Sequence, residues 1–168
     1  MNYIEQIPDL QCLVLDDSHI TMARLARSPL LQRLNWLNLK RVHDPLLPVI
    51  QSLKNSTRMG VLELIGATLT KDEYKALADL GSLWNLNLDQ TGVTDENLKA
   101  MVGKLKLKVL QVQENRLTTA SIPTAKKLLL LKQSGGWFNI TSTNMPERDC
   151  QQFAKELSGT LVSGRERK

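Results

Sequence analysis

Aliphatic residues return along the chain at fixed offsets. In LQVQENRLT, residues 110–118, leucine, valine and leucine occupy the first, third and eighth positions, and asparagine occupies the sixth. The arrangement recurs at nearly even intervals, and its last copy is a degenerate one inside GGWFNITSTNM. Such spacing indicates a repeat protein in which each unit packs on its neighbours. The six copies begin near residues 10, 34, 59, 83, 107 and 135.

Each copy predicts a short strand followed by a helix. The LxL segment alternates apolar and polar residues, which is typical of a strand with one buried face. In the third copy, Thr70 and Glu73 then form a capping box that marks a helix start. The helical spacing of Tyr74, Leu77 and Leu80 lets these side chains face the leucines of the strand. One strand and one helix cannot bury their own apolar faces, so stability must come from stacking of the copies.

These residues resemble the leucine-rich repeat family, whose LxxLxLxxN/TxL core is matched in five copies and loosely in the sixth. The likeness covers residues 10 to about 157, and LWNLNLDQTGVTDENLKAMV, residues 83–102, is similar to bacterial LxxLxLxxTxVTDxxLxxL repeats and to the ribonuclease-inhibitor-like class. It implies an α/β solenoid, a short horseshoe of about six strand-helix repeats, with a parallel concave sheet and helices on the convex side. Asn115 has the asparagine of the family pattern and is expected to support a loop. The other copies have Ser18, Val42, Ala67, Thr91 and Thr143 there.

The two ends of the chain differ from the repeats. We interpret the whole chain, residues 1–168, as one domain whose last stretch, residues 158–168, is a basic and frayed tail. At the other end, YIEQIPDL has the character of a helix that leads directly into the first copy, which leaves the first strand with an open edge. Open strand edges favour association. The sequence therefore predicts a segment of a longer repeat protein, or a chain that packs this edge on a partner or on a second copy.

The chain shows no targeting segment. Its N-terminus lacks the basic and apolar regions of a secretion signal, and no stretch approaches the ~20 apolar residues that span a membrane. We therefore expect a cytoplasmic protein without membrane contact. Cys12 and Cys150 fall in the first and last copies, roughly 24 Å apart at ~4.8 Å per strand, which is beyond disulfide reach. We expect Cys150 to be a core residue of the last helix.

The charge of the chain has two interpretations. The 22 Lys and Arg residues exceed the 17 Asp and Glu residues, which gives a formal net charge of +5. Basic residues gather before the strands and acidic residues after them, which is the distribution that helix dipoles favour. The alternative is a functional basic flank that binds an anionic ligand or nucleic acid. Its members would be Arg33, Arg58, Lys104, Lys106 and Lys132.

The concave sheet is the predicted binding face. It presents the residues between and just after the buried leucines. Trp36 and Trp137 are candidate anchors because tryptophan is favoured at interfaces, and amides beside them can hydrogen-bond a partner. The sequence thus predicts a non-catalytic scaffold for a protein partner, and the alternatives are the basic flank or a regulatory segment of a larger multidomain protein. The predicted contact residues are Trp36, Asn38, Lys40, Glu63, Asn87, Asp89, Gln111, Gln113, Trp137 and Asn139.

No motif in the sequence points to catalysis. The chain has no glycine-rich phosphate loop, no GxSxG and no CxxC or HExxH spacing. His19 and His43 share one repeat position near Asp16, Asp17 and Asp44, but polar loops commonly hold such residues. We therefore expect no catalytic residues, no metal site and no small-molecule cofactor.

Overall fold

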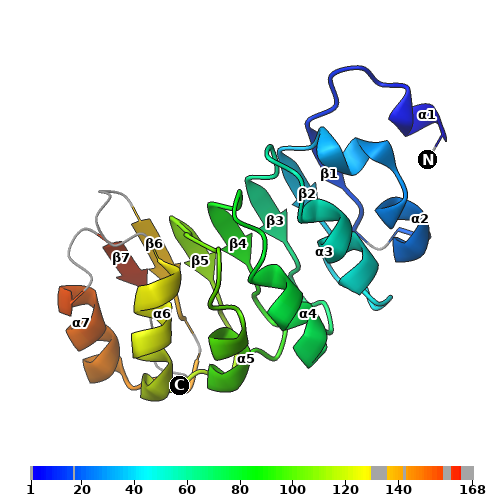
Figure 1. Cartoon of the computed structure of the whole chain (residues 1–168). Coiled ribbons are helices and arrows are strands. Elements are labelled where there is room, and N and C mark those ends of the chain that lie inside the picture. Colours follow the sequence, from blue (N-terminus) through cyan, green and yellow to red (C-terminus); the bar gives the residue numbers. More distant parts are fainter. Residues whose placement is uncertain (1, 17, 130–135, 142, 157–159, 164–168) are drawn as a thin grey trace.

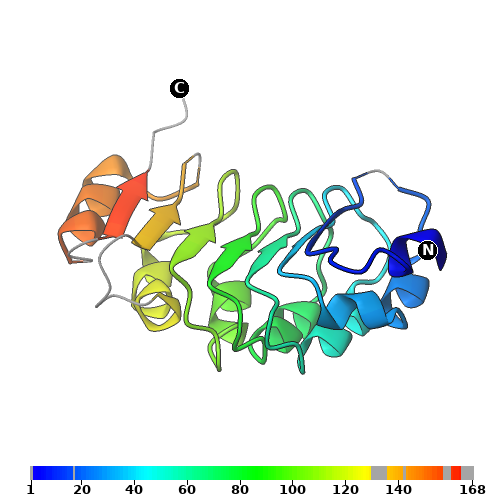
Figure 2. The same ribbon diagram turned by 90° about the horizontal axis from the view of Figure 1, so that it is seen from above.

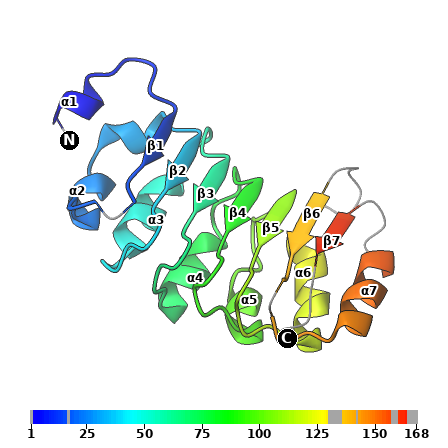
Figure 3. The same cartoon turned by 180° about the vertical axis from the view of Figure 1, so that it is seen from behind.

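The repeats form a single parallel sheet. The computed structural model describes residues 2–16, 18–129, 136–141, 143–156 and 160–163. Within these residues, seven strands pair in the order in which they occur along the chain. Figures 1 and 3 show them side by side along the whole molecule. The strands are β1 (Cys12–Val14), β2 (Trp36–Asn38), β3 (Val61–Glu63), β4 (Asn85–Asn87), β5 (Val109–Gln111), β6 (Gly136–Asn139) and β7 (Thr160–Ser163).

Helices cover one side of this sheet. Figure 2 shows the sheet on the inner side of a shallow arc and the helices on the outer side. The predicted α/β solenoid with a concave sheet is therefore confirmed. The helices are α1 (Asn2–Glu5), α2 (Met22–Ala26), α3 (Leu47–Leu53), α4 (Lys71–Leu77), α5 (Asp95–Ala100), α6 (Ile122–Leu128) and α7 (Glu147–Glu156), with 3₁₀ turns η1 (Pro29–Gln32) and η2 (Thr119–Ser121).

The last strand differs from the prediction. Residues 158–168 were predicted to form a frayed tail, but Thr160–Ser163 form β7 and pair with all four residues of β6. The pairing satisfies backbone groups on the outer edge of β6, which would otherwise face solvent. The frayed-tail prediction is therefore wrong for residues 160–163, and the rest of that stretch lies outside the described residues.

The core is a stack of aliphatic side chains between the sheet and the helices. The central residues of the first six strands lie in register, so one apolar column runs along the sheet. Every member of the column is buried. Cys150 on α7 is also part of the core, as predicted, whereas Cys12 is exposed, and both are free thiols. The column consists of Leu13, Leu37, Leu62, Leu86, Leu110 and Phe138.

A recurring turn follows four of the strands. Arg41, Gly66, Gln90 and Glu114 occupy equivalent repeat positions, and each has a positive φ, at 55°, 68°, 59° and 53°. Their backbone N–H groups donate to carbonyls of the next repeat over 2.8 to 3.0 Å, which extends the parallel ladder beyond the strands. Three of these residues are not glycine, so the fold bears a steric cost there in return for the turn.

The loops at the ends of the strands are held by buried polar side chains. We call this side of the sheet the strand-end edge and the opposite side, where the strands begin, the strand-start edge. Glu73 closes the predicted capping box with Thr70, whose N–H donates to its carboxylate over 2.7 Å. The same carboxylate also accepts the N–H groups of Leu46 and Leu47, at 2.5 and 2.9 Å. Glu73 therefore ties the start of α4 to the start of α3.

Asn115 has the supporting role that the sequence predicts. Its side-chain oxygen accepts the N–H of Val93 over 2.9 Å, and its amide donates to the carbonyls of Leu88 and Gln113 over 2.8 and 3.0 Å. Asn115 is buried, so these bonds replace contacts with water. It links two repeats through the backbone.

The N-terminal segment is bonded to the first repeat. The guanidinium of Arg33 donates to the carbonyls of Glu5 and Pro8 over 2.9 and 3.0 Å, and Ser28 donates to the Glu5 carboxylate over 2.6 Å. Among the residues that the structure describes, β1 pairs with β2 alone. None of the helices in the described segments has the length and apolar character that crossing a membrane requires.

Candidate binding surface on the concave sheet

Strand pairing arranges the outward side chains in columns. Trp36, Val61, Asn85, Val109 and Trp137 lie in register at the first outward position of their strands. A second column holds the next outward residues, and a third follows immediately after the strands. The predicted contact residues of the second and third columns are Asn38, Glu63, Asn87, Gln111 and Asn139, and Lys40, Asp89 and Gln113.

The columns differ in exposure from one end of the sheet to the other. Val14 on β1 is 55% exposed, and Trp36 and Trp137 are each 37% exposed. Asn87 and Asn139, by contrast, are only 5% exposed. The two tryptophans therefore present apolar surface to solvent, whereas the two asparagines present almost none.

The asparagines of the second column accept hydrogen bonds from the backbone. The side-chain oxygens of Asn38, Asn87 and Asn139 each accept the N–H of the residue two positions later, over 3.0, 2.9 and 3.2 Å. These local bonds are typical of asparagine in turns. Asn87 and Asn139 thus stabilise the strand ends, and the expectation that their amides face a partner does not agree with their burial.

Glu63 is the centre of a polar cluster on β2 and β3. The amide of Asn38 donates to its carboxylate over 2.9 Å. Burial raises the pKa of Glu63 above its ordinary value, and the negative charges of Asp16 and Asp89 raise it further. A hydrogen bond from Trp36 and the charge of Lys40 lower the pKa in part. This carboxylate is therefore held on the face against unfavourable desolvation and repulsion.

Asp89 and Gln113 form a second polar pair on the face. The N–H and the side-chain amide of Gln113 both donate to the Asp89 carboxylate, over 2.7 and 3.2 Å. Burial raises the pKa of Asp89, although the hydrogen bonds from Gln113 and Asn87 oppose this shift. The middle of the concave face therefore holds a half-buried carboxylate, and an exposed tryptophan lies on each side of it, Trp36 on β2 and Trp137 on β6.

The fold resembles those of solved bacterial repeat proteins. An internalin (inlF) from Listeria monocytogenes superposes with a TM-score of 0.59 at 16% sequence identity, over 98% of this chain and 50% of that one. An internalin C2 (inlC2) from the same organism gives a TM-score of 0.43 at 16% identity, over 92% of this chain and 80% of that one. The sequence matches no model of a protein family and no curated protein.

The likeness to the first internalin and the repeating strand-helix units indicate the same fold. The chain has the fold of a leucine-rich-repeat solenoid. It spans half the length of the internalin inlF. At this level of identity the likeness concerns the fold.

The predicted basic flank is not uniform. Arg33 is half-buried and bonded to carbonyls of the N-terminal segment, so its role is structural. Arg58, Lys104 and Lys106 are exposed, and the ammonium of Lys106 donates to the carbonyl of Lys127 over 3.4 Å. Lys132 lies outside the described residues.

One exposed tryptophan was absent from the predicted surface. Trp84 stands immediately before β4 and is 45% exposed, more than Trp36 or Trp137. The signal in the sequence is Gly60, which occupies the same position one repeat earlier. A residue without a side chain leaves room for the indole of the neighbouring repeat.

The two histidines lie together but without a set of ligands. His19 and His43 line one shallow hollow with Ser18, Arg41 and Asp44. Asp17 lies outside the described residues. Elsewhere along the described chain, and in this hollow, no three His, Cys, Asp or Glu side chains are grouped as a metal site requires.

Proposed function

We propose that this leucine-rich-repeat protein is a non-catalytic scaffold that binds a partner protein through its concave sheet. The contact surface comprises Trp36, Asn38, Lys40 and Glu63 on one side, Asp89, Gln111 and Gln113 in the middle, and Trp137 at the far end. Asn87 and Asn139 belong to the supporting structure of this surface. The cytoplasmic location, the absence of a cofactor and a contact through the edge of β1 stay predictions.

The observation that carries the proposal is the cluster of Trp36 and Glu63. An exposed tryptophan and a carboxylate with a raised pKa lie on neighbouring, directly paired strands of the sheet. Neither side chain is needed to fill the core, and the carboxylate is unfavourably placed for folding. Residues that cost stability without packing the core are typical of functional surfaces. Tryptophan in such a setting is a frequent source of binding energy.

Affinity capture with point variants tests the proposal. The immobilised full chain is incubated with an extract of its source cells, and bound proteins are identified by mass spectrometry. We expect a partner that the wild type retains and that Trp36→Ala and Glu63→Lys each lose by about tenfold or more.

The matched control is Lys99→Glu on α5, which reverses one exposed charge on the convex side. This variant is expected to retain the partner within about twofold. Equal retention by all four proteins, with thermal unfolding unchanged, would contradict the use of the concave sheet.

A further inference from the structure

Trp84 is held against the backbone of the neighbouring repeat. A Cβ atom at Gly60 would lie 2.4 Å from the indole Nε1 and 2.9 Å from Cδ1, so only glycine leaves room for the ring. Gly60 is buried, whereas 45% of Trp84 remains exposed. A large aromatic side chain is thereby fixed at the strand-start edge with much of its surface accessible. A side chain fixed in this way loses little conformational entropy when a partner binds.

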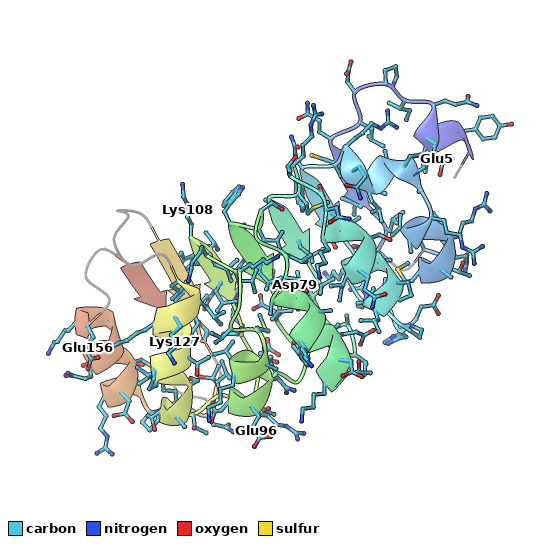
Figure 4. The ribbon with its side chains drawn as sticks, in the orientation of Figure 1. Glu5, Asp79, Glu96, Lys108, Lys127 and Glu156 are labelled. Carbon is cyan, nitrogen blue, oxygen red and sulfur yellow. The ribbon has the colours of Figure 1, made fainter. Side chains whose placement is uncertain are left out.

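The backbone places a lysine directly beside this tryptophan. Trp84 N–H donates to the carbonyl of Gly60 over 3.0 Å, and Lys108 N–H donates to the carbonyl of Trp84 over 2.8 Å. Gly60, Trp84 and Lys108 thus occupy one row of the ladder in three successive repeats, at a spacing of ~4.8 Å. Figure 4 shows the Lys108 side chain projecting away from the helices, at the opposite side of the molecule from Glu96.

Two further cations lie two residues before members of the row. Arg58 precedes Gly60 by two residues, Lys106 precedes Lys108 by two, and all three cations are exposed. In the part of the chain that the structure describes, no carboxylate forms an ion pair with Arg58 or Lys108. Asp79, five residues before Trp84, is already paired with Lys54 over 2.9 Å, which lowers the pKa of Asp79. Positive charge at this edge is therefore available to a ligand.

We propose that this strand-start surface, the Trp84 edge, binds an acidic peptide segment of a partner protein. The Trp84 edge comprises Arg58, Gly60, Trp84, Lys106 and Lys108. Carboxylates of the segment pair with Arg58 and Lys108, Lys106 adds positive charge beside them, and the apolar side chains of the segment cover the indole. Charge complementarity of this kind gives specificity and fast association, and tryptophan and arginine are enriched among residues that dominate binding energy.

The arrangement fits a peptide better than a single-stranded nucleic acid. A strand of nucleic acid stacks successive bases on several aromatic side chains along a basic groove. Among the described residues of this row, Trp84 is the one aromatic side chain, and the other members are Gln11, Asn35, Gly60, Lys108 and Gly136. The proposal does not rest on the concave surface, which lies on the outward face of the strands and uses Trp36.

Fluorescence anisotropy with a defined probe tests the Trp84 edge. The probe is a short fluorescein-labelled peptide of glutamate and leucine, titrated with the full chain at low salt. We expect saturable binding that Trp84→Ala and Lys108→Glu each weaken by about tenfold. Gly60→Ala keeps every charge but displaces the indole, and we expect it to weaken binding by about threefold or more. The tryptophan emission of Gly60→Ala should also differ from that of the wild type, because the indole of Trp84 is displaced.

Two control variants distinguish binding at the Trp84 edge from nonspecific electrostatic binding and from binding to the concave sheet. Lys75→Glu reverses one exposed charge on α4, and Trp36→Ala removes the concave tryptophan. Both variants are expected to bind the peptide within about twofold of the wild type. Thermal unfolding of each variant shows that the fold is intact.

Four results would overturn the proposal. These are an absence of peptide binding at low salt, equal weakening by Lys75→Glu, tighter binding of oligodeoxythymidylate than of the peptide, and a loss of peptide binding in Trp36→Ala alone. The last result would move the peptide to the concave sheet and would leave the proposed scaffold function standing. Loss of the captured partner in Trp36→Ala, with peptide binding intact, would separate the two surfaces.

Discussion

Asparagine has opposite roles at the two edges of the sheet. At the strand-end edge, Asn115 is buried and bonds three backbone groups across two repeats. At the strand-start edge, Asn35 is exposed and its side-chain amide donates to the side chain of Gln11 over 2.9 Å. The same residue type is therefore part of the fold at one edge and part of the accessible surface at the other.

The difference follows from the course of the chain. At the strand-end edge the chain must turn into a helix, which leaves N–H groups without partners, and buried side chains satisfy them. At the strand-start edge the helix has already ended and the backbone continues the parallel ladder. Side chains at the strand-start edge are not needed to satisfy backbone N–H groups, so a tryptophan and several cations can face solvent. Variants at the two edges should accordingly differ in what they damage.

The largest loss of stability is expected for Glu73→Ala. The substitution removes a buried carboxylate that accepts from Leu46, Leu47 and Thr70 and leaves their donors unsatisfied. We expect the free energy of unfolding to fall by about 3 to 5 kcal/mol. Chemical denaturation of Glu96→Ala, an exposed glutamate at the start of α5, should show a change within about 0.5 kcal/mol. Similar losses in both variants would contradict the role of Glu73 as a tie between repeats.

Asn115→Ala and Asn35→Ala test the comparison with one residue type. The first substitution leaves the buried N–H of Val93 and the carbonyl of Leu88 without their side-chain partner. We expect a loss of about 2 to 3 kcal/mol for Asn115→Ala and less than about 0.5 kcal/mol for Asn35→Ala. Urea unfolding of the two variants measures the difference. An equal effect of the two substitutions would remove the distinction between the edges.

The difference between the two edges of the sheet could be predicted from the sequence only where the responsible residues are close together in the chain. Repeated leucines specify which strands form and which face is buried, and the capping box of Thr70 and Glu73 lies within four residues. The bonds from Glu73 to Leu46 and Leu47 join residues of adjacent repeats, and no local pattern indicates them. The position of the Trp84 indole likewise depends on Gly60, one repeat earlier in the chain.

Residues at equivalent repeat positions can also differ in burial, because burial depends on the packing of each repeat. Asn38 and Asn87 stand at the same repeat position and make the same bond to the residue two positions later. Asn38 is half-exposed and reaches Glu63, whereas Asn87 is buried. β7 was missed for a related reason, because Thr160–Ser163 lack the leucine spacing that identifies the other strands.

A smaller effect on stability is expected for substitutions in the recurring turn that follows the strands. Gly66 has φ +68°, and the nearest atom to an added Cβ is Arg41 Cγ at 3.4 Å, so the cost of Gly66→Ala comes from the backbone conformation. We expect a loss of about 1 kcal/mol. Gln90→Gly should instead add about 0.5 to 1 kcal/mol, because Gln90 has φ 59° at the equivalent position. Thermal unfolding of Gln90→Ala is the control, since it keeps a side chain at positive φ and should leave stability nearly unchanged.

The smallest effect is a pH dependence on the concave face. Burial, with the charges of Asp16 and Asp89, raises the pKa of Glu63 above its ordinary value of 4.5, so the folded chain binds this proton more tightly than the unfolded chain does. The stabilisation from the protonated carboxyl is complete below pH 4.5 and is lost as pH rises through the raised pKa. Glu63→Gln removes this loss, so the wild type should become less stable relative to the variant between acid and neutral pH. The change is expected to be less than about 1 kcal/mol because the group is partly exposed. Urea unfolding of both proteins across this range measures it, and a wild type that gains stability over the variant as pH rises would show that Glu63 supports the fold.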